Sequence, residues 1–137
     1  MLNNKILVIE DEEIVIETIR EVLKGRCYEI ISAKNGKEGL AEYEKEQPIL
    51  VILDLMMPVM NGVEFLENLK IRYHDICSVI VLTGHGDNED IKKCFDLGVF
   101  SFIKKPFDIN VFRGTVMNTI KAEQLQQELV DEIRRCK

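Results

Sequence analysis

The stretch Ile49-Leu50-Val51-Ile52-Leu53-Asp54-Leu55-Met56-Met57-Pro58 decides the fold of this chain. Its first five residues are apolar and three are β-branched, which predicts a short strand buried on both faces, as in a parallel sheet. Asp54 is then expected at the carboxyl edge of that sheet, where open α/β folds bind their ligands. Pro58 and Asn61-Gly62 predict an irregular loop before the next helix. A lone Asp at such a position often only ends a strand or caps a helix, so the other strands decide its meaning.

Three other strand-like runs also end in polar residues. Residues 6–9 lead into Glu10-Asp11-Glu12-Glu13, residues 79–82 into Thr83-Gly84, and residues 100–103 into Lys104-Lys105-Pro106-Phe107. Apolar residues at helical spacing separate the runs, a pattern typical of βα units. Right-handed crossovers favour a doubly wound, five-stranded parallel sheet of order 2-1-3-4-5 with helices on both faces. This order brings Asp11 and Asp54 together.

The predicted edge of the sheet gathers carboxylates, a hydroxyl and an ammonium. Carboxylates in one place repel each other unless protons or a cation offset their charge. Mg²⁺ suits such a site, because it binds one or two carboxylates, a carbonyl and waters. A threonine and a lysine beside the metal are the groups that stabilise a phosphoryl group. The predicted chemistry is phosphoryl transfer to or from Asp54.

The four segments together resemble the signature of response-regulator receiver domains of two-component signalling, over roughly residues 4 to 122. The resemblance implies a flavodoxin-like fold, Mg²⁺ as cofactor, and roles for individual residues. These are Asp54 as phosphoacceptor and metal ligand, Asp11 as metal ligand, Glu10 as ligand through a water, Met56 as ligand through its backbone carbonyl, Thr83 as phosphoryl-binding and switch residue, Lys105 as partner of the phosphate charge, and Phe102 as switch aromatic.

Some of these positions depart from the family pattern or compete with neighbours. The family usually has Asp where this chain has Glu10, so the reach of this carboxylate is altered. Phe102 has no hydroxyl, and it acts by packing alone or belongs only to the core. Adjacent strand residues point to opposite faces, and the family places its lysine directly before proline, which selects Lys105 over Lys104. Glu12 and Glu13 are assigned to the helix dipole and left out of the site.

The resemblance also implies partners and an output. A sensor histidine kinase or phosphotransfer protein would donate the phosphoryl group from phosphohistidine, and the domain would then switch conformation to control an output. The chain would catalyse only its own phosphorylation and dephosphorylation. A homodimer would form through the fourth helix, fifth strand and fifth helix, or through the C-terminal helix.

Three alternatives belong to other functional classes. A phosphatase of haloacid-dehalogenase type also uses a strand-end Asp, but it needs a second Asp two residues later, where this chain has Met56. A flavodoxin-like cofactor binder needs a polar, donor-rich loop after the first strand, and the acids at 10–13 would repel its phosphate. A receiver kept only as an unphosphorylated interaction module would not need Asp54, Thr83 and Lys105 together.

Composition limits the functional classes and locations that are expected for the chain. The chain has 137 residues, 46% hydrophobic and 31% charged, with net charge −6. Nucleic-acid binding by this segment is disfavoured, because it needs a basic face. No apolar run is long enough to span a membrane and no signal peptide is seen, so a cytoplasmic location is expected. The four scattered cysteines are expected to be reduced thiols that mostly pack in the core. His74 and His85 are expected to be surface or loop residues.

The tail departs from a minimal receiver. Residues 1–122 are predicted to form the receiver domain and residues 123–137 a helical extension, because this stretch has no Gly or Pro. Leu125, Leu129 and Ile133 form an apolar stripe. The extension is either a solvated helix or the start of a coiled-coil connector to an effector domain absent from this chain. Beyond Ile120 the helix is expected to gain little from packing on the domain.

Overall fold

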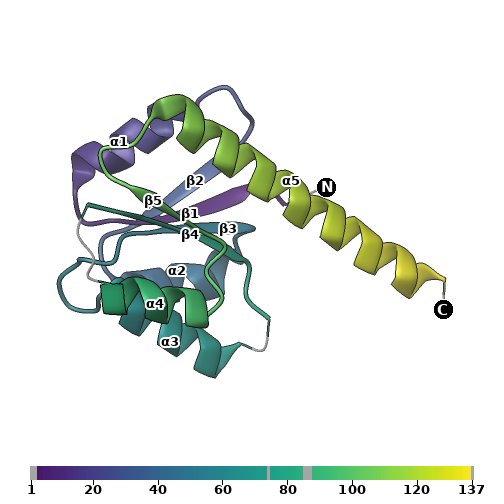
Figure 1. Ribbon diagram of the computed structural model, residues 1–137. Coiled ribbons are helices and arrows are strands. Elements are labelled where there is room, and N and C mark those ends of the chain that lie inside the picture. Colours follow the sequence, from purple (N-terminus) through teal and green to yellow (C-terminus); the bar gives the residue numbers. More distant parts are fainter. Residues whose placement is uncertain (1–2, 74, 85–87, 137) are drawn as a thin grey trace.

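A single five-stranded parallel sheet forms the centre of the protein, in the order β2-β1-β3-β4-β5 (Figure 1). The computed structural model describes residues 3–73, 75–84 and 88–136. The strands are β1 (Lys5–Ile9), β2 (Glu29–Ala33), β3 (Leu50–Leu53), β4 (Ser78–Thr83) and β5 (Ser101–Lys104). The predicted fold class and strand order are therefore confirmed. His74 and His85, which are expected at the surface or in loops, lie outside the described residues.

Helices cover both faces of the sheet. Figure 1 shows α1 (Glu13–Val22) and α5 (Ile109–Arg135) on one face, and α2 (Gly36–Glu46), α3 (Gly62–Arg72) and α4 (Asn88–Asp96) on the other. Three helices begin with a side-chain cap of the expected kind. Asn35 accepts from the backbone N–H of Glu38, Asp108 from that of Val111, and Asn61 forms a reciprocal capping box with Glu64.

The core has two halves, one on each face of the sheet. Alternate residues of the central strands supply both: Val51 packs with α2 and α3 residues such as Phe65, while Ile52 packs with α1 and α5 residues such as Phe112. All four residues of β3 are buried. This burial on both faces is why the sequence of β3 is continuously apolar rather than alternating, and it fixes the strand from which Asp54 emerges.

Helix α5 runs without interruption past residue 122 to Arg135. Its first turn beyond the domain contacts the amino-terminal edge of the sheet: Glu123 accepts a hydrogen bond from the Ser78 hydroxyl, and Gln124 donates to the carbonyl of Asn3 at 3.0 Å. The expectation that the helix gains little from the domain beyond Ile120 is wrong for this turn. Polar contacts hold this turn against the domain, whereas the expectation was based on apolar packing alone.

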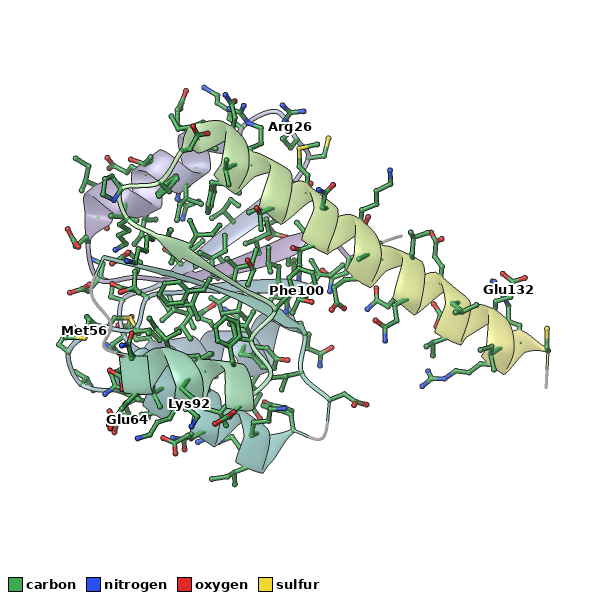
Figure 2. All side chains as sticks on the ribbon, viewed as in Figure 1. Arg26, Met56, Glu64, Lys92, Phe100 and Glu132 are labelled. Atoms are coloured by element: carbon green, nitrogen blue, oxygen red, sulfur yellow. The ribbon has the colours of Figure 1, made fainter. Side chains whose placement is uncertain are left out.

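The rest of α5 projects from the body of the protein (Figure 1). Three apolar side chains there, Leu125, Leu129 and Ile133, are more than half exposed, and Val130 is 40% exposed. Figure 2 shows Glu132 well outside the domain. Within the described residues, no helix is both long and apolar enough to cross a membrane.

The cysteines depart in part from expectation. All four are free thiols. Only Cys94 is buried and Cys77 is half-buried, whereas Cys27 and Cys136 are exposed. The prediction of core packing for most of them is wrong, because Cys27 lies in the connection between α1 and β2 with positive φ, and Cys136 lies at the end of the projecting helix.

Gly62 holds the loop after β3 close to the sheet. Its N–H donates to the Leu55 carbonyl at 3.0 Å. A Cβ at this position would lie 2.6 Å from the carbonyl oxygen of Asp54 and 2.8 Å from the Cα of Leu55. Both are backbone atoms that cannot rotate away, so only glycine allows α3 to begin this close to the end of β3.

We therefore expect Gly62→Ala to lower the free energy of unfolding by about 1–3 kcal/mol, because the loop must shift. Gly114→Ala in α5 is the matched control, since a Cβ there would meet nothing within 4 Å. The control should gain up to about 1 kcal/mol from helix propensity. Urea unfolding of both variants measures the difference, and equal stability of the two would contradict the close approach.

Candidate functional site

A cavity of about 530 Å³ lies at the carboxyl edge of the sheet and is called the carboxyl-edge cavity below. Residues that follow β1, β3, β4 and β5 converge on it, as the strand order predicts. It is lined by Asp11, Glu12, Asp54, Met56, Thr83, Gly84, Lys105 and Pro106.

Asp54 directly follows β3 and is only 5% exposed. Its backbone N–H donates to the Ile9 carbonyl at 3.0 Å, which extends the β1–β3 pairing up to the site. Its Oδ1 accepts from the N–H of Met56 at 3.2 Å. This local bond fixes the orientation of the carboxylate. The side chain of Met56 is exposed, and Figure 2 shows it on the loop after β3.

Lys105 is the cation of the site. Its Nζ lies 2.5 Å from Glu10 Oε1, 3.5 Å from Asp54 Oδ2 and 3.8 Å from Glu12 Oε1. Its backbone N–H donates to the Thr83 carbonyl at 3.0 Å, and the Lys105–Pro106 peptide bond is cis. Burial lowers the pKa of Lys105, but the hydrogen bond to Glu10 and the neighbouring carboxylates outweigh it, so the pKa is raised. The ammonium is therefore held in its charged form.

Lys104 takes a different position. It is the last residue of β5, pairs in register with Thr83 and is exposed. It does not line the carboxyl-edge cavity. The alternation of strand side chains thus separates the two adjacent lysines, as expected.

Glu10 is the most buried carboxylate at this edge, at 2% exposure. Its Oε2 accepts from the backbone N–H of Glu12 at 3.2 Å, and its Oε1 bonds Lys105. Burial raises the pKa of Glu10 to about 8, against the lowering effect of Lys105 and together with the nearby Asp54. The longer side chain of Glu thus reaches across to the lysine.

Glu10, Asp11 and Glu12 form an acidic group whose carboxylate oxygens lie within 4.8 Å of one another. Oxygen ligands in this number fit a hard divalent cation such as Mg²⁺. Glu12, which was assigned to the helix dipole, lines the cavity and lies near Lys105. It is the N-cap residue of α1 but makes no side-chain cap. That helix starts beside the site, which is the signal that could have identified Glu12.

Glu13 and Phe102 lie outside the cavity. Glu13 is in the first turn of α1, as expected, and makes an exposed ion pair with Lys34 at 3.8 Å. Phe102 is half-buried, pairs in register with Val81 and packs against the core on the α2–α4 face. Thr83, by contrast, is 2% exposed and lines the cavity from the end of β4.

Sequence comparison identifies the relatives of the chain. The family model of the response regulator receiver domain matches residues 6–117. Sporulation initiation phosphotransferase F of Bacillus subtilis is 35% identical over 85% of this chain and 93% of its own length. The transcriptional regulatory protein CrdR of Helicobacter pylori is 34% identical over 84% of this chain but only 54% of its own length. The match therefore spans about half of that longer relative.

Comparison with solved structures points to the same family. The signal receiver domain of a putative Luxo repressor protein from Vibrio parahaemolyticus has a TM-score of 0.86 at 25% identity, covering 93% of this chain and 98% of that chain. A CheY-like receiver domain protein from Methanospirillum hungatei has a TM-score of 0.82 at 25% identity, with 90% and 98% coverage. Strand order, edge cavity and family match lead to one conclusion: the chain belongs to the response-regulator receiver domains of two-component signalling.

Proposed function

We propose that Asp54 is the phosphoacceptor of this receiver domain. The observation that carries the proposal is one cavity lined by Asp54, Lys105, Thr83 and two members of the acidic group, Asp11 and Glu12. The third member, Glu10, does not line the cavity but is bonded to Lys105. Within this cavity Asp54 is a buried carboxylate whose Oδ1 is held by the Met56 N–H, while Oδ2 faces Lys105. A phosphoryl donor would approach the open side, and the fixed carboxylate would attack in line.

The residues that would hold Mg²⁺ are Asp11 and Asp54 directly, Glu10 through a water, and Met56 through its backbone carbonyl. Glu12 joins this set as a further acid at the rim. The bound cation would offset the negative charge that develops between the carboxylate and the phosphoryl group. Receiver domains bind Mg²⁺ through such acidic clusters, and the oxygen donors of this chain fit that requirement.

Lys105 and Thr83 would act on the modified state. Lys105 is shared between Glu10 and Asp54, so a phosphoryl group on Asp54 would draw the ammonium from Glu10 toward the new charge. Thr83 would donate its hydroxyl to a phosphoryl oxygen. Its inward movement would then leave room for Phe102, which is half-buried and can repack. Such a switch is a population shift driven by the different affinity of the two conformations for phosphate.

The alternatives do not fit the site. A haloacid-dehalogenase-type phosphatase needs an acid at position 56, and Met56 has no proton to give. A flavodoxin-like cofactor phosphate would meet the carboxylates of the acidic group. As a receiver, the chain is a signalling phosphoacceptor rather than an enzyme acting on a separate substrate, and its only reactions would be gain and loss of its own phosphoryl group.

The first test labels the acceptor. With Mg²⁺ and acetyl phosphate, the protein should gain one acid-stable, base-labile phosphoryl group, and Asp54→Asn or removal of Mg²⁺ with EDTA should reduce it to background. Glu12→Gln should weaken Mg²⁺ binding, while Glu13→Gln should not. Mass spectrometry locates the label, and equal labelling of Asp54→Asn would overturn the assignment.

The second test separates the two lysines. Lys105→Ala should still accept phosphate slowly but fail to reach the activated conformation, because nothing pairs with the new charge. Lys104→Ala is the matched control and should behave as the unmodified protein does. Amide spectra recorded with and without beryllofluoride compare the variants, and the reverse pattern would assign the phosphate role to Lys104.

The third test uses the raised pKa of Glu10. A folded-state pKa of about 8 against an ordinary value of 4.5 means that the folded protein binds this proton more tightly than the unfolded chain. In metal-free buffer, Glu10 should therefore contribute a fall in stability as pH rises from about 5 to about 8. Glu10→Gln should lose this component and Glu13→Gln should keep it, by urea unfolding at each pH. Identical pH dependence of Glu10→Gln and the unmodified protein would refute the shift.

Partners follow from the family. Receiver domains work with histidine kinases or phosphotransfer proteins, and we propose a phosphohistidine of such a protein as the donor. Residues 1–122 would form the receiver domain, and 123–137 a connector to an effector. A second copy would bind through α4, β5 and α5 or through the exposed stripe of α5. No nucleic acid would be bound by this segment.

The stripe can be tested directly. Leu129→Asp places a charge at a side chain that is 62% exposed, so the isolated fold should keep its stability while self-association through α5 weakens. Glu128→Gln is the control on the same exposed part of the helix. Sedimentation over a range of concentrations, with and without beryllofluoride, measures the effect. Unchanged sedimentation in Leu129→Asp would leave only the face formed by α4, β5 and α5.

A further inference from the structure

A second cavity, of about 550 Å³, lies at the amino-terminal edge of the sheet, opposite to the carboxyl-edge cavity. This amino-edge cavity lies where the chain enters β3 and β4, where Ile49 and Cys77 line it, and α5 contributes Glu123. The proposed phosphoryl chemistry uses none of these residues, so the cavity needs a separate explanation.

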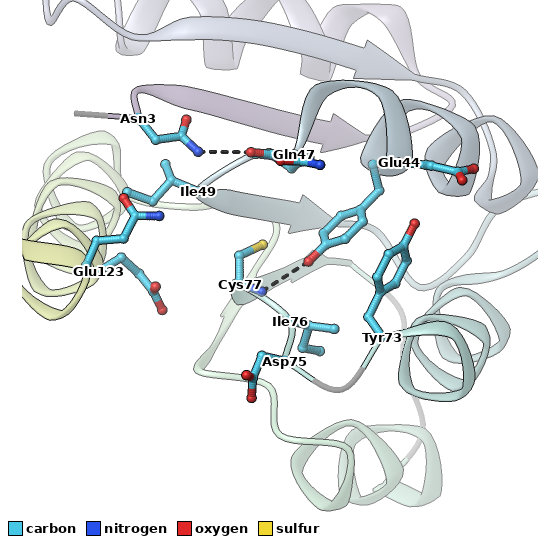
Figure 3. Close-up of a pocket in the computed structure, with 12 residues that line it drawn as sticks. Asn3, Glu44, Gln47, Ile49, Tyr73, Asp75, Ile76, Cys77 and Glu123 are labelled. Atoms are coloured by element: carbon cyan, nitrogen blue, oxygen red, sulfur yellow. Dashed lines mark hydrogen bonds between the residues drawn. The ribbon is translucent and has the colours of Figure 1, made fainter. Parts of the chain in front are cut away.

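One wall of the amino-edge cavity is aromatic. The rings of Tyr43 and Tyr73 lie 5.2 Å apart, centre to centre, at an angle of 55°. Tyr43 is 7% exposed, and its hydroxyl accepts from the backbone N–H of Cys77 at 3.2 Å, which fixes the ring (Figure 3). Tyrosine faces attract cations, and their carbon edges pack against apolar chains.

The opposite wall is acidic. Figure 3 shows Glu123 on α5 on one side of Cys77, Tyr73 on the other, and Asp75 on the adjoining loop. Glu123 accepts one hydrogen bond, from Ser78, and a carboxylate has capacity for more. Among the described residues, no lysine or arginine lines the amino-edge cavity itself, and Lys70 lines an adjoining cavity together with Asp75 and Glu123. Glu44 also lines it, but in Figure 3 its carboxylate points away from Cys77.

A metal ion does not suit this arrangement. Among the described residues, only Glu10, Asp11 and Glu12 bring three potential ligands within 4.8 Å of each other, and these belong to the other edge. Burial raises the pKa of the Cys77 thiol to about 12, so the thiol keeps its proton and is a poor ligand. A cation that binds between these acids would therefore be a larger, organic group.

We propose that the amino-edge cavity binds an organic cation, a guanidinium or primary ammonium group at the end of an apolar chain. The charged group lies between Asp75 and Glu123, and the chain packs against Tyr43 and Tyr73. The same chemistry is offered by a small free amine and by an arginine side chain of a partner protein. Because Glu123 belongs to α5 and Asp75 to the loop before β4, the ligand bridges the projecting helix to the domain.

The test uses agmatine, which carries a guanidinium and an ammonium on a short apolar chain. Amide spectra are recorded with up to about 10 mM agmatine, a range that detects millimolar dissociation constants. Excess Mg²⁺ is present, so that the acidic group at the carboxyl edge does not compete. Shifts should appear at Tyr43, Tyr73, Asp75 and Glu123, and they should weaken with added salt.

Single substitutions test whether Glu123 and Asp75 are responsible for agmatine binding. Glu123→Gln keeps an oxygen acceptor for Ser78 but removes the charge, and it should weaken agmatine binding by about ten-fold or more, as should Asp75→Asn. Glu128→Gln, on the same helix but outside the cavity, should bind as the unmodified protein does. Unaltered affinity in both Glu123→Gln and Asp75→Asn would overturn the proposal.

Two further arms complete the test. An uncharged amide of the same length should not bind, and equal binding of this analogue would contradict a cation site. A short arginine-containing peptide that binds more tightly than agmatine would identify a partner side chain as the source, and the opposite order would identify a free amine. Absence of shifts at the amino-edge cavity with both ligands would refute the proposal.

Discussion

The crowding of carboxylates at the carboxyl ends of β1 and β3 is the constraint on which the site depends. Parallel pairing of these two strands fixes Glu10 and Asp54 in neighbouring positions, both almost fully buried. A single ammonium, that of Lys105, lies between them and is closer to Glu10 than to Asp54. Two acids and one cation leave one carboxylate without a counter-charge when both acids are ionised. Burial is the main cause of the raised pKa of Glu10, and the neighbouring Asp54 adds to it. A divalent cation at the acidic group would offset this charge.

The crowded acids do not stabilise the fold. The cores on the two faces of the sheet are apolar and lie apart from these acids, and their packing offsets the loss of stability that the acids cause. A local rule is broken beside the site, at the N-cap of α1, where Glu12 makes no side-chain cap and lines the cavity instead. The glycine at position 62 belongs to the same group of constraints, because it holds the loop after Asp54 against the strand.

Much of the fold could be predicted from sequence, because short apolar runs and helical stripes have distinct periods. The convergence of Asp11, Asp54, Thr83 and Lys105 follows from strand order alone. Glu12 was missed, because an acid at the start of a helix has a sufficient explanation in the helix dipole. The contacts of Glu123 and Gln124 were missed for another reason: isolated polar pairs between distant segments have no periodic signature. The preference of Lys105 for Glu10 over Asp54 depends on side-chain length and could not be read from spacing.

The two edges of the sheet are joined by the same strands, and this limits how one edge can affect the other. β4 runs from Ser78, which holds Glu123 of α5, to Thr83 in the carboxyl-edge cavity. Its residues from Val79 to Thr83 are buried, and a closely packed strand cannot slide by a fraction of a residue. The proposed conformational change would therefore have to involve groups that are less tightly packed, such as the side chain of Thr83, the half-buried Phe102 on β5, and helix α5. Because α5 is continuous from Ile109 to Arg135, a small rotation of the helix against the sheet would also move its exposed stripe. The polar contacts at Glu123 and Gln124 would restrain such a rotation.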